Sequence, residues 1–341
     1  MRNYILRDEN AVYYECGFSC DNEIFLKLSD EAFFITDPRY TIAAKESIKN
    51  AEVIEANDLF KATREILRKK RAKRLFYNPK EWPLEDFRKI SEKISTYFYP
   101  KSNFSQKKRI IKTQKEIELI KQAVHIGAEA FDKFSRFLQQ NGEGKNEKEL
   151  LFEISAILSK KGEYDLSFTP IVAIGENAAK PHATATKKSL KIGDLILVDA
   201  GVKYRRYCSD RTRTAVFGDH ITFKKEQRFK DRKIQKIYDI VLKAQEAAIK
   251  AVKPGVKAYE VDKKAREVIE EAGYGKYFVH STGHGVGLDI HELPVISFKD
   301  KETILKENMV FTIEPGIYLE GEFGVRIEDM VVVTEKGCEI L

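Results

Sequence analysis

The sequence predicts an α+β fold in two domains, the second built from two similar halves. Three observations support this prediction. The chain has 341 residues, more than the roughly 100–200 of one ordinary domain. Its first part alternates short apolar runs with amphipathic stretches, and from residue 113 onward the order helix, helix, strand, strand occurs twice. We therefore expect domains over residues 1–105 and 106–341.

The first domain shows an alternation typical of a small α/β unit. Apolar runs predict strands at residues 23–28, 32–36 and 74–77. Amphipathic periodicity predicts helices at residues 40–48, 59–70 and 84–96. No residue in this domain belongs to a catalytic pattern, so we expect the chemistry in the second domain.

The second domain is interpreted as a duplicated half, because a solenoid needs at least three copies of its repeat. The first copy predicts helices at 113–140 and 146–161 and strands at 194–199 and 210–216. The second predicts helices at 233–252 and 258–272 and strands at 309–314 and 325–333. Thr113 and Glu116 form a capping box at the first helix. Between the copies, the segment 219–236 is rich in Lys, Arg and Glu and is interpreted as a solvated loop or helix extension.

The composition favours a cytoplasmic protein that binds neither nucleic acid nor membrane. Lys and Arg total 60 against 53 Asp and Glu, and the formal net charge of +7 is too small to indicate a polyanionic partner. No apolar run approaches the roughly 18–20 residues of a membrane-spanning helix, and the charged start does not resemble a secretory signal. The four cysteines form no motif, so we expect free thiols in a reducing compartment.

Two predicted hairpins carry pairs of carboxylates. Asp199 ends one apolar strand and Asp210 begins the next, so a hairpin centred between Tyr204 and Arg205 would set them directly opposite each other. Glu314 and Glu328 are related in the same way about Gly321, a preferred turn residue. Like charges repel at such a spacing, and buried carboxylates need compensation. Two divalent metal ions are the expected compensation.

A histidine completes this set of candidate ligands. His284 stands among glycines 283, 285 and 287, which disfavour helix formation and allow the backbone to approach the site closely. In an extended segment, His280 and His284 would point to one face. Structural zinc sites are built from Cys and His, whereas a set of four carboxylates and one histidine suits Mn²⁺. Co²⁺ and Zn²⁺ are the alternatives.

Five motifs together resemble the dinuclear metallopeptidases that include methionine aminopeptidase, Xaa-Pro aminopeptidase and prolidase. They lie, in the order of that family, at residues 181–183, 194–200 with 208–214, 280–292, 312–316 and 325–329. The resemblance implies a pita-bread fold, which agrees with the duplication. It also implies five metal ligands, with Asp210 and Glu328 as bridges between the ions: Asp199, Asp210, His284, Glu314 and Glu328.

Three features resemble the proline-specific branch of that family. They are His280, four residues before the ligand histidine, the run Arg326-Ile327-Glu328, and residues 36–40, which are similar to part of a creatinase-like N-terminal domain. This branch implies an exopeptidase that hydrolyses the bond before proline, on dipeptides or longer peptides with proline second, and a homodimer. The cationic turn at residues 204–207 and the long segment 219–236 depart from the expected pattern.

The resemblance also assigns catalytic roles. Glu314 would shuttle the proton of the attacking water, and His291 and His182 would stabilise the oxyanion or steer the peptide. His280 would contact the substrate on its proline side, and Arg326 would hold a ligand carboxylate. The alternatives are a methionine aminopeptidase-like activity and a non-catalytic pita-bread binding protein, although the latter would be expected to have lost ligands.

Overall fold

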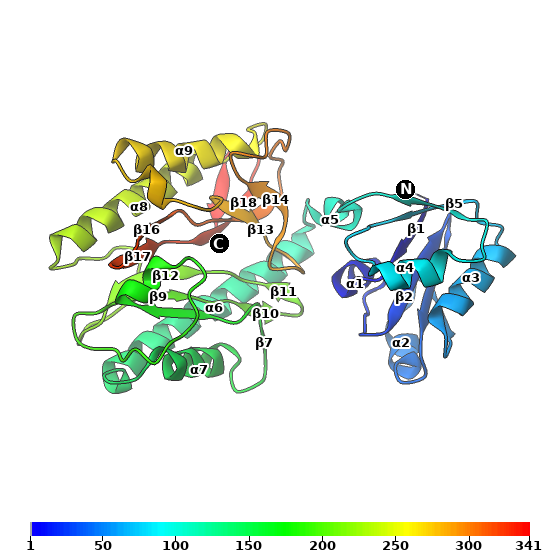
Figure 1. Ribbon diagram of the computed structural model, residues 1–341, viewed down its shortest axis with the longest axis horizontal. Coiled ribbons are helices and arrows are strands. Elements are labelled where there is room, and N and C mark those ends of the chain that lie inside the picture. The colour runs from blue at the N-terminus through cyan, green and yellow to red at the C-terminus, as the bar shows by residue number, and fades with distance from the viewer. Residues whose placement is uncertain (1) are drawn as a thin grey trace. The chain divides into compact units, whose positions relative to one another are not determined.

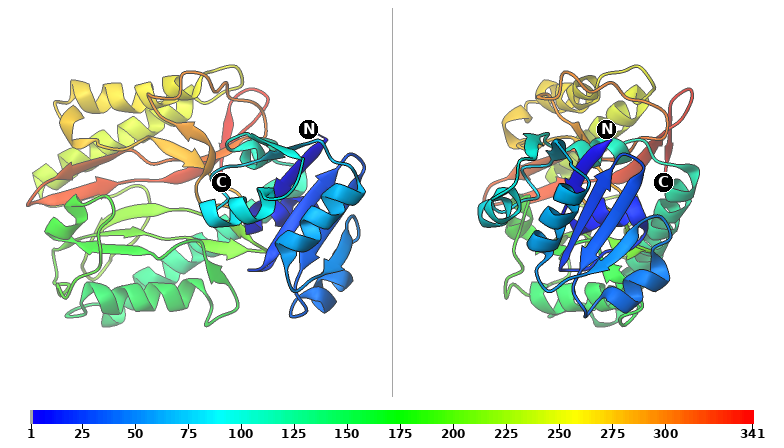
Figure 2. Two further views of the ribbon diagram at one scale, coloured as in Figure 1. Left: turned by 45° about the vertical axis from the view of Figure 1, so that its right-hand side comes forward. Right: turned by 90° about the vertical axis from the view of Figure 1, so that its right-hand side faces the viewer.

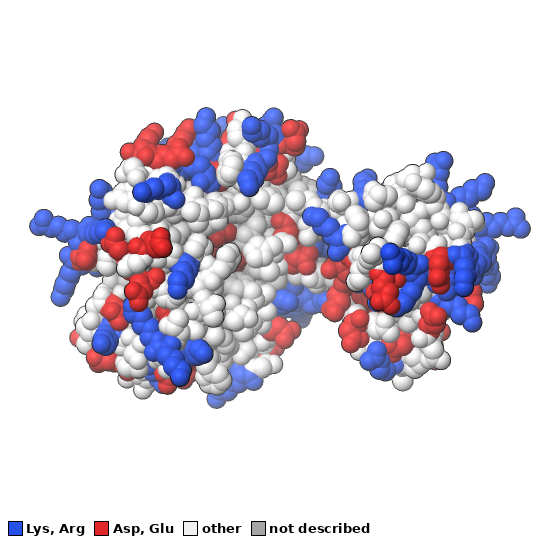
Figure 3. Space-filling model, in the orientation of Figure 1, with Lys and Arg blue, Asp and Glu red and all other residues white. Residues whose placement is uncertain are grey.

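The structure, a computed structural model, describes residues 2–341 and divides into two units at Arg109 and Ile110 (Figure 1). No helix within the described residues is both long and apolar enough to cross a membrane. All four cysteines are free, as predicted. Basic and acidic side chains are interspersed on the face shown in Figure 3, in keeping with the small net charge.

The N-terminal unit is a six-stranded mixed sheet with strand order β4-β3-β2-β1-β5-β6. The strands are β1 (Asn3–Leu6), β2 (Glu23–Leu28), β3 (Glu31–Thr36), β4 (Glu52–Glu55), β5 (Arg74–Tyr77) and β6 (Tyr97–Pro100). The helices are α1 (Glu9–Cys16), α2 (Thr41–Ser47), α3 (Leu59–Lys69), α4 (Leu84–Ser91) and α5 (Phe104–Arg109).

Both faces of this sheet are covered, as the two views of Figure 2 show. Phe25 of β2 packs in one apolar cluster with Val12 of α1, whereas its neighbours Ile24 and Leu26 pack in another with Leu67 of α3. Burial on both sides explains why β2 appears in the sequence as a continuous apolar run. The helix expected at 84–96 is shorter than predicted, because the chain leaves α4 after Ser91 and pairs as β6 from Tyr97.

The C-terminal unit repeats two helices followed by strands, as predicted. Its helices are α6 (Gln114–Asn141), α7 (Glu147–Leu158), α8 (Arg232–Ala251) and α9 (Ala258–Glu271), with short 3₁₀ helices η1 (Gly175–Ala179) and η2 (Gly275–Tyr277). Thr113 forms the predicted capping box with Glu116 at the start of α6. On β9, Ile196 and Val198 face the cluster containing α6 and α7, whereas alternate residues face the cluster containing α8 and α9.

The strands of this unit form four small sheets. The first half contains β12-β9-β8 and β11-β10-β7: β7 (Asp165–Leu166), β8 (Ile171–Ile174), β9 (Leu195–Asp199), β10 (Val202–Tyr204), β11 (Tyr207–Cys208) and β12 (Thr212–Val216). The second half contains β14-β13-β15-β18-β19 and β16-β17: β13 (Gly283–Gly285), β14 (Glu292–Ile296), β15 (Val310–Ile313), β16 (Gly316–Leu319), β17 (Phe323–Arg326), β18 (Asp329–Val333) and β19 (Cys338–Ile340).

The first hairpin differs from its predicted register. Asp199 pairs with Thr212 and not with Asp210, so the two aspartates are not directly opposed. The turn lies at Arg205 and Arg206, whose φ angles are 47° and 73°, in place of the expected centre one residue earlier. Both residues adopt the left-handed conformation that two-residue turns need, without the Gly or Asn that would mark it in the sequence. The shift of two residues on one strand keeps the same side chains on the same face.

The second hairpin has the predicted centre. The β15–β18 and β16–β17 ladders share one register about Gly321, which has φ 72°. Glu314 and Glu328 face each other on that register, in the interruption between the two ladders. The single strand expected at 325–333 is therefore divided into β17 and β18 around Glu328.

The segment 219–236 is not simply a solvated loop. Ile221 and Phe223 are 3% and 4% exposed and belong to the cluster beneath α6 and α7. The sequence interpretation is wrong for this part, because the charges that flank these two residues obscure their apolar pattern. Residues 219–231 are irregular, and α8 begins at Arg232.

Candidate metal centre

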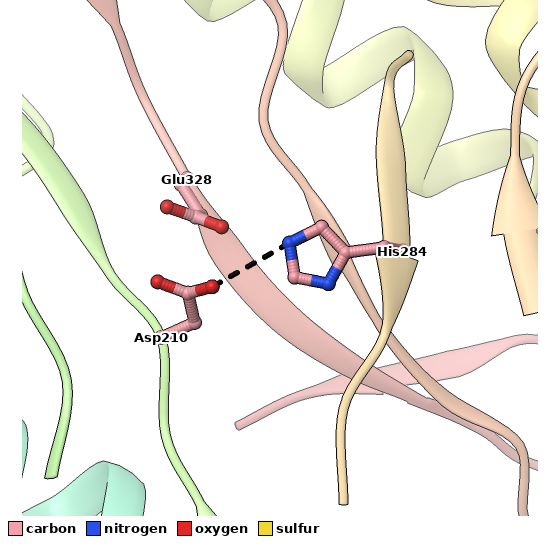
Figure 4. A group of neighbouring side chains, drawn as sticks. All are labelled: Asp210, His284 and Glu328. Atoms are coloured by element: carbon pink, nitrogen blue, oxygen red, sulfur yellow. Dashed lines mark ion pairs between the residues drawn. The ribbon is translucent and has the colours of Figure 1, made fainter. Parts of the chain in front are cut away.

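Three of the predicted ligands converge in the C-terminal unit (Figure 4). Potential ligand atoms of Asp210, His284 and Glu328 all lie within 4.8 Å of one another. Asp210 precedes β12, His284 lies on β13, and Glu328 lies between β17 and β18. The two halves of the unit therefore both contribute to this group.

The main chain orients the ring of His284. The main-chain N–H of His284 donates to Thr312 Oγ1 at 3.1 Å. A Cβ atom on the preceding Gly283 would lie 1.8 Å from the carbonyl oxygen of Thr312, so only glycine allows the two chains to lie this close. His284 Nδ1 lies 3.2 Å from the carbonyl oxygen of Gly285, which can only accept, so Nδ1 carries the proton. Nε2 is left with a free lone pair, 3.5 Å from Asp210 Oδ2 and 3.3 Å from Glu314 Oε1. Burial lowers the pKa of His284, which keeps the ring neutral.

Three carboxylate oxygens in this region are buried without a hydrogen-bond partner: Asp199 Oδ1, Asp210 Oδ1 and Glu328 Oε1. Burial, and then the neighbouring carboxylates, raise the pKa of Asp210 and of Glu328 well above their usual values. Burial also raises the pKa of Glu314. Buried carboxylate oxygens without a hydrogen-bond partner, beside a neutral imidazole nitrogen, are a donor set that a divalent cation satisfies when it displaces their protons. The residues present therefore fit the predicted metal ions.

A second layer of side chains holds these carboxylates. Arg326 is buried and its Nη2 donates to Asp199 Oδ2 at 2.7 Å, while its Nε donates to Thr212 Oγ1 at 3.0 Å. Thr212 in turn donates to Glu328 Oε2 at 2.6 Å. Thr312 Oγ1 donates to Glu314 Oε1 at 3.1 Å. Asp199 Oδ1 and Glu328 Oε1, which accept no hydrogen bond, are thus left for a metal.

The remaining predicted histidines surround this centre. The ring of His291 lies over that of His284, with centroids 4.1 Å apart, and partial burial followed by repulsion from His284 lowers its pKa to about 4. His182 lies in the loop after η1, where the carbonyl oxygen of Pro181 accepts a hydrogen bond from Arg326 at 3.2 Å.

His280 is engaged at both ring nitrogens. Nδ1 donates to the carbonyl oxygen of Ser281, and Nε2 lies 2.8 Å from the hydroxyl of Tyr318, which itself accepts from Arg326. Residues 280–282 are not part of β13, so His280 and His284 do not share the extended segment expected from the sequence.

The sequence reasoning missed Thr212, Thr312 and Tyr318. The two threonines stand two residues from Asp210 and Glu314, on the same face of an extended chain, and this spacing could have identified them. Tyr318 carries no comparable signal, because only the β16–β17 hairpin brings its hydroxyl to Arg326 and His280.

Comparison with known proteins identifies the family. Residues 118–335 match metallopeptidase family M24, and residues 2–114 match the creatinase/prolidase N-terminal domain. The chain belongs to metallopeptidase family M24. This confirms the predicted resemblance and the fold, a pita-bread catalytic domain preceded by a creatinase-like domain.

Relatives of this M24 chain cover its full length. An Xaa-Pro dipeptidase of Pyrococcus furiosus is 37% identical over 100% of this chain and 92% of its own. The structure of an Xaa-Pro dipeptidase from Bacillus anthracis, 34% identical, superimposes with a TM-score of 0.91 over 99% of this chain and 92% of its own. That of an X-Pro aminopeptidase from Thermotoga maritima, 37% identical, superimposes with a TM-score of 0.87 over 100% and 95%.

Proposed function

We propose that this M24 chain is a metal-dependent exopeptidase that hydrolyses the peptide bond before proline. The observation that carries the proposal is that ligand atoms of Asp210, His284 and Glu328 converge at the seam between the two halves, where Asp210 Oδ1 and Glu328 Oε1 have no hydrogen-bond partner. The names of full-length relatives support proline specificity over the alternatives of a methionine aminopeptidase and a non-catalytic protein.

Asp199, Asp210, His284, Glu314 and Glu328 would hold two divalent ions, for which Mn²⁺ is the expected metal. Bound divalent ions lower the pKa of water toward neutrality and so supply hydroxide as the nucleophile. The protein contributes the orientation of the ligands. Arg326 and Thr212 fix one oxygen of Asp199 and of Glu328, and Gly285 fixes the tautomer of His284.

Glu314 is assigned to proton transfer. Its raised pKa brings the carboxylate closer to the range in which it can accept a proton from water and pass it to the leaving amine. His291 and His182 would orient the scissile carbonyl and stabilise its oxyanion. The lowered pKa of His291 means that it acts as a neutral donor at physiological pH.

His280 is assigned to the proline side of the substrate. A peptide bond before proline has no N–H, so the site must recognise the ring itself. Tyr318 and Ser281 occupy both nitrogens of His280, and burial lowers its pKa. The ring is therefore neutral, and with both nitrogens engaged it would offer only its carbon atoms to a substrate.

Rates on three peptides test this proposal. Ala-Pro, Ala-Pro-Ala and Met-Ala-Ser are assayed with Mn²⁺ and again after chelation. Cleavage of a proline peptide that requires metal and far exceeds cleavage of Met-Ala-Ser supports the proposal. Equal cleavage of Met-Ala-Ser and Ala-Pro-Ala contradicts it. Because relatives named as dipeptidase and as aminopeptidase are equally similar at 37% identity, the ratio of the first two rates assigns the substrate length.

The identity of the metal, the oligomeric state and the compartment also belong to this proposal. We propose Mn²⁺ over Co²⁺ and Zn²⁺, a homodimer, and a cytoplasmic location, to which four free thiols are suited. Reconstitution of the metal-free protein with each ion, light scattering of the purified protein, and cell fractionation test the three statements in turn.

A further inference from the structure

A buried polar network surrounds Asp329, the first residue of β18, which follows Glu328 in the chain. Successive residues of a strand point to opposite faces, so Asp329 points away from the candidate metal centre. Its carboxylate accepts from Arg213 at Oδ1, and from Lys225 and Gln245 at Oδ2, at 3.2 and 3.1 Å. Asp329, Arg213 and Gln245 are all buried.

The same donors also hold the main chain beside both candidate glutamates. Arg213 Nη1 donates to the carbonyl oxygens of Glu328 and Thr212. Gln245 Nε2 donates to the carbonyl oxygen of Ile313, the residue before Glu314, at 3.2 Å. One network therefore fixes the backbone positions from which Glu314 and Glu328 project.

Lys225 brings this network a charge from the basic segment 219–236. Two contacts hold the segment near Lys225. The ring of Phe223 packs edge-to-face on Phe131, with centroids 5.5 Å apart, and the hydroxyl of Tyr238 donates to the carbonyl oxygen of Lys225 at 2.7 Å. The side chain of Lys225 is 21% exposed, whereas the neighbouring Lys224 is exposed. These contacts direct the side chain of Lys225 toward Asp329.

Lys225 supplies a second cation to the Asp329 carboxylate. Arg213 and Lys225 pair with different oxygens of this carboxylate, Oδ1 and Oδ2. Without Lys225, Asp329 would depend on Arg213 and Gln245, and each of these also donates to main-chain carbonyl oxygens. The cation from the segment keeps Asp329 in place and lets Arg213 retain its contact with Glu328.

We propose that Lys225 and Asp329 are positioning residues for the metal centre, with Lys225 holding Asp329 so that Arg213 and Gln245 fix the chain beside Glu328 and Glu314. This inference deepens the proposed function, on which it rests, because it gives the basic segment 219–236 a part in metal retention. It assigns no contact between Lys225 and substrate.

Lys225→Met tests the proposal, because methionine keeps the length and flexibility of the side chain without its charge. Lys224→Met is the matched control in the same segment, and Lys225→Arg restores the charge. For each protein, the Mn²⁺ dissociation constant is measured by titration calorimetry, and the visible absorption spectrum of the Co²⁺-substituted form reports the ligand geometry. Asp329→Asn, which keeps the side-chain volume, is a second variant if Lys225→Met loses its cooperative melting transition.

We expect Lys225→Met to weaken Mn²⁺ binding by about tenfold and to alter the Co²⁺ spectrum, as the loss of outer partners does at metal sites. Lys224→Met should match the wild type, and Lys225→Arg should restore both readouts. Unchanged affinity and spectrum in a folded Lys225→Met protein would overturn this inference and leave the proposed function intact. A wild-type protein that binds no divalent metal would overturn both.

Discussion

The hydroxyl of Thr212 joins Arg326 to Glu328 in the candidate metal centre and can be removed without changing the shape of the side chain. The residue is 0% exposed, donates to Glu328 Oε2 at 2.6 Å and accepts from Arg326 Nε at 3.0 Å. Thr212→Val leaves both groups with one fewer partner. A hydrogen bond to a charged group such as Arg326 contributes about 1.5–3 kcal/mol and one between neutral groups about 0.5–1.5 kcal/mol, so we expect the free energy of unfolding of the metal-free protein to fall by roughly 3 kcal/mol.

Metal binding should weaken as well, because Glu328 loses the donor that orients it. Loss of such a partner lowers metal affinity by about 10–100-fold. A tenfold change corresponds to about 1.4 kcal/mol, so metal should stabilise the variant by that much less than it stabilises the wild type. The melting temperature with and without Mn²⁺ and the Mn²⁺ dissociation constant measure the two effects separately.

Thr214→Val provides the control for this prediction. Thr214 lies on the same strand, is also 0% exposed, and exchanges hydrogen bonds only with the main chain of Arg326, at 3.0 and 3.2 Å. Its loss should lower stability and leave the Mn²⁺ affinity unchanged. Equal Mn²⁺ affinities for the wild type and both variants would refute the reasoning that Thr212 positions Glu328.

Three further predictions concern the reaction and its dependence on pH. Glu314→Gln should lower kcat by about 100-fold or more, the usual effect of losing an acid–base group, and retention of kcat at normal metal content would exclude it as the shuttle. His280→Ala should lower kcat/KM for Ala-Pro-Ala at unchanged metal content, and a decrease that follows metal loss would contradict the proline-side assignment. The Mn²⁺ affinity should rise with pH, because the raised pKa values of Asp210 and Glu328 mean that metal displaces protons there, whereas the lowered pKa of His284 leaves no proton to displace. Calorimetry in two buffers of different ionisation enthalpy should show net proton release near pH 6, and proton uptake would contradict the electrostatics described for this centre.

The parts of the fold that the sequence predicted are those with strong local signals. The strands 23–28 and 74–77 have the predicted bounds, because continuous apolar runs end at turn residues. Helices α8 and α9 lie within one residue of their predicted ends, since their apolar faces repeat over many turns. Strand β4 was not predicted, because none of its four side chains is buried and Val53 and Ile54 are its only apolar residues.

In the candidate site, too, the features that could be predicted are those with a local sequence signal. Gly321 marked the second hairpin, and with it the pairing of Glu314 and Glu328, because a positive φ favours glycine. Arg205 and Arg206 adopt positive φ without glycine, so the register of the first hairpin was misplaced. The family resemblance assigned Arg326 to a ligand carboxylate but did not specify Asp199. The contact of Tyr318 with His280 joins residues far apart in the chain, and no local pattern specifies it.

The position of the centre at the seam between two halves explains why its surroundings are so polar. Asp199 and Asp210 come from the first half, and His284, Glu314 and Glu328 from the second. Apolar packing holds each half but tolerates small shifts, whereas metal ligands must be placed to within a fraction of an ångström. The pairs Arg326–Asp199, Thr212–Glu328 and Arg213–Asp329 cross the seam with defined donors and acceptors. Replacing such a buried pair as a whole by apolar side chains would change stability little, whereas removing one partner is costly. The pairs fix one relative position of the halves, and that position is the one in which the five candidate ligands meet.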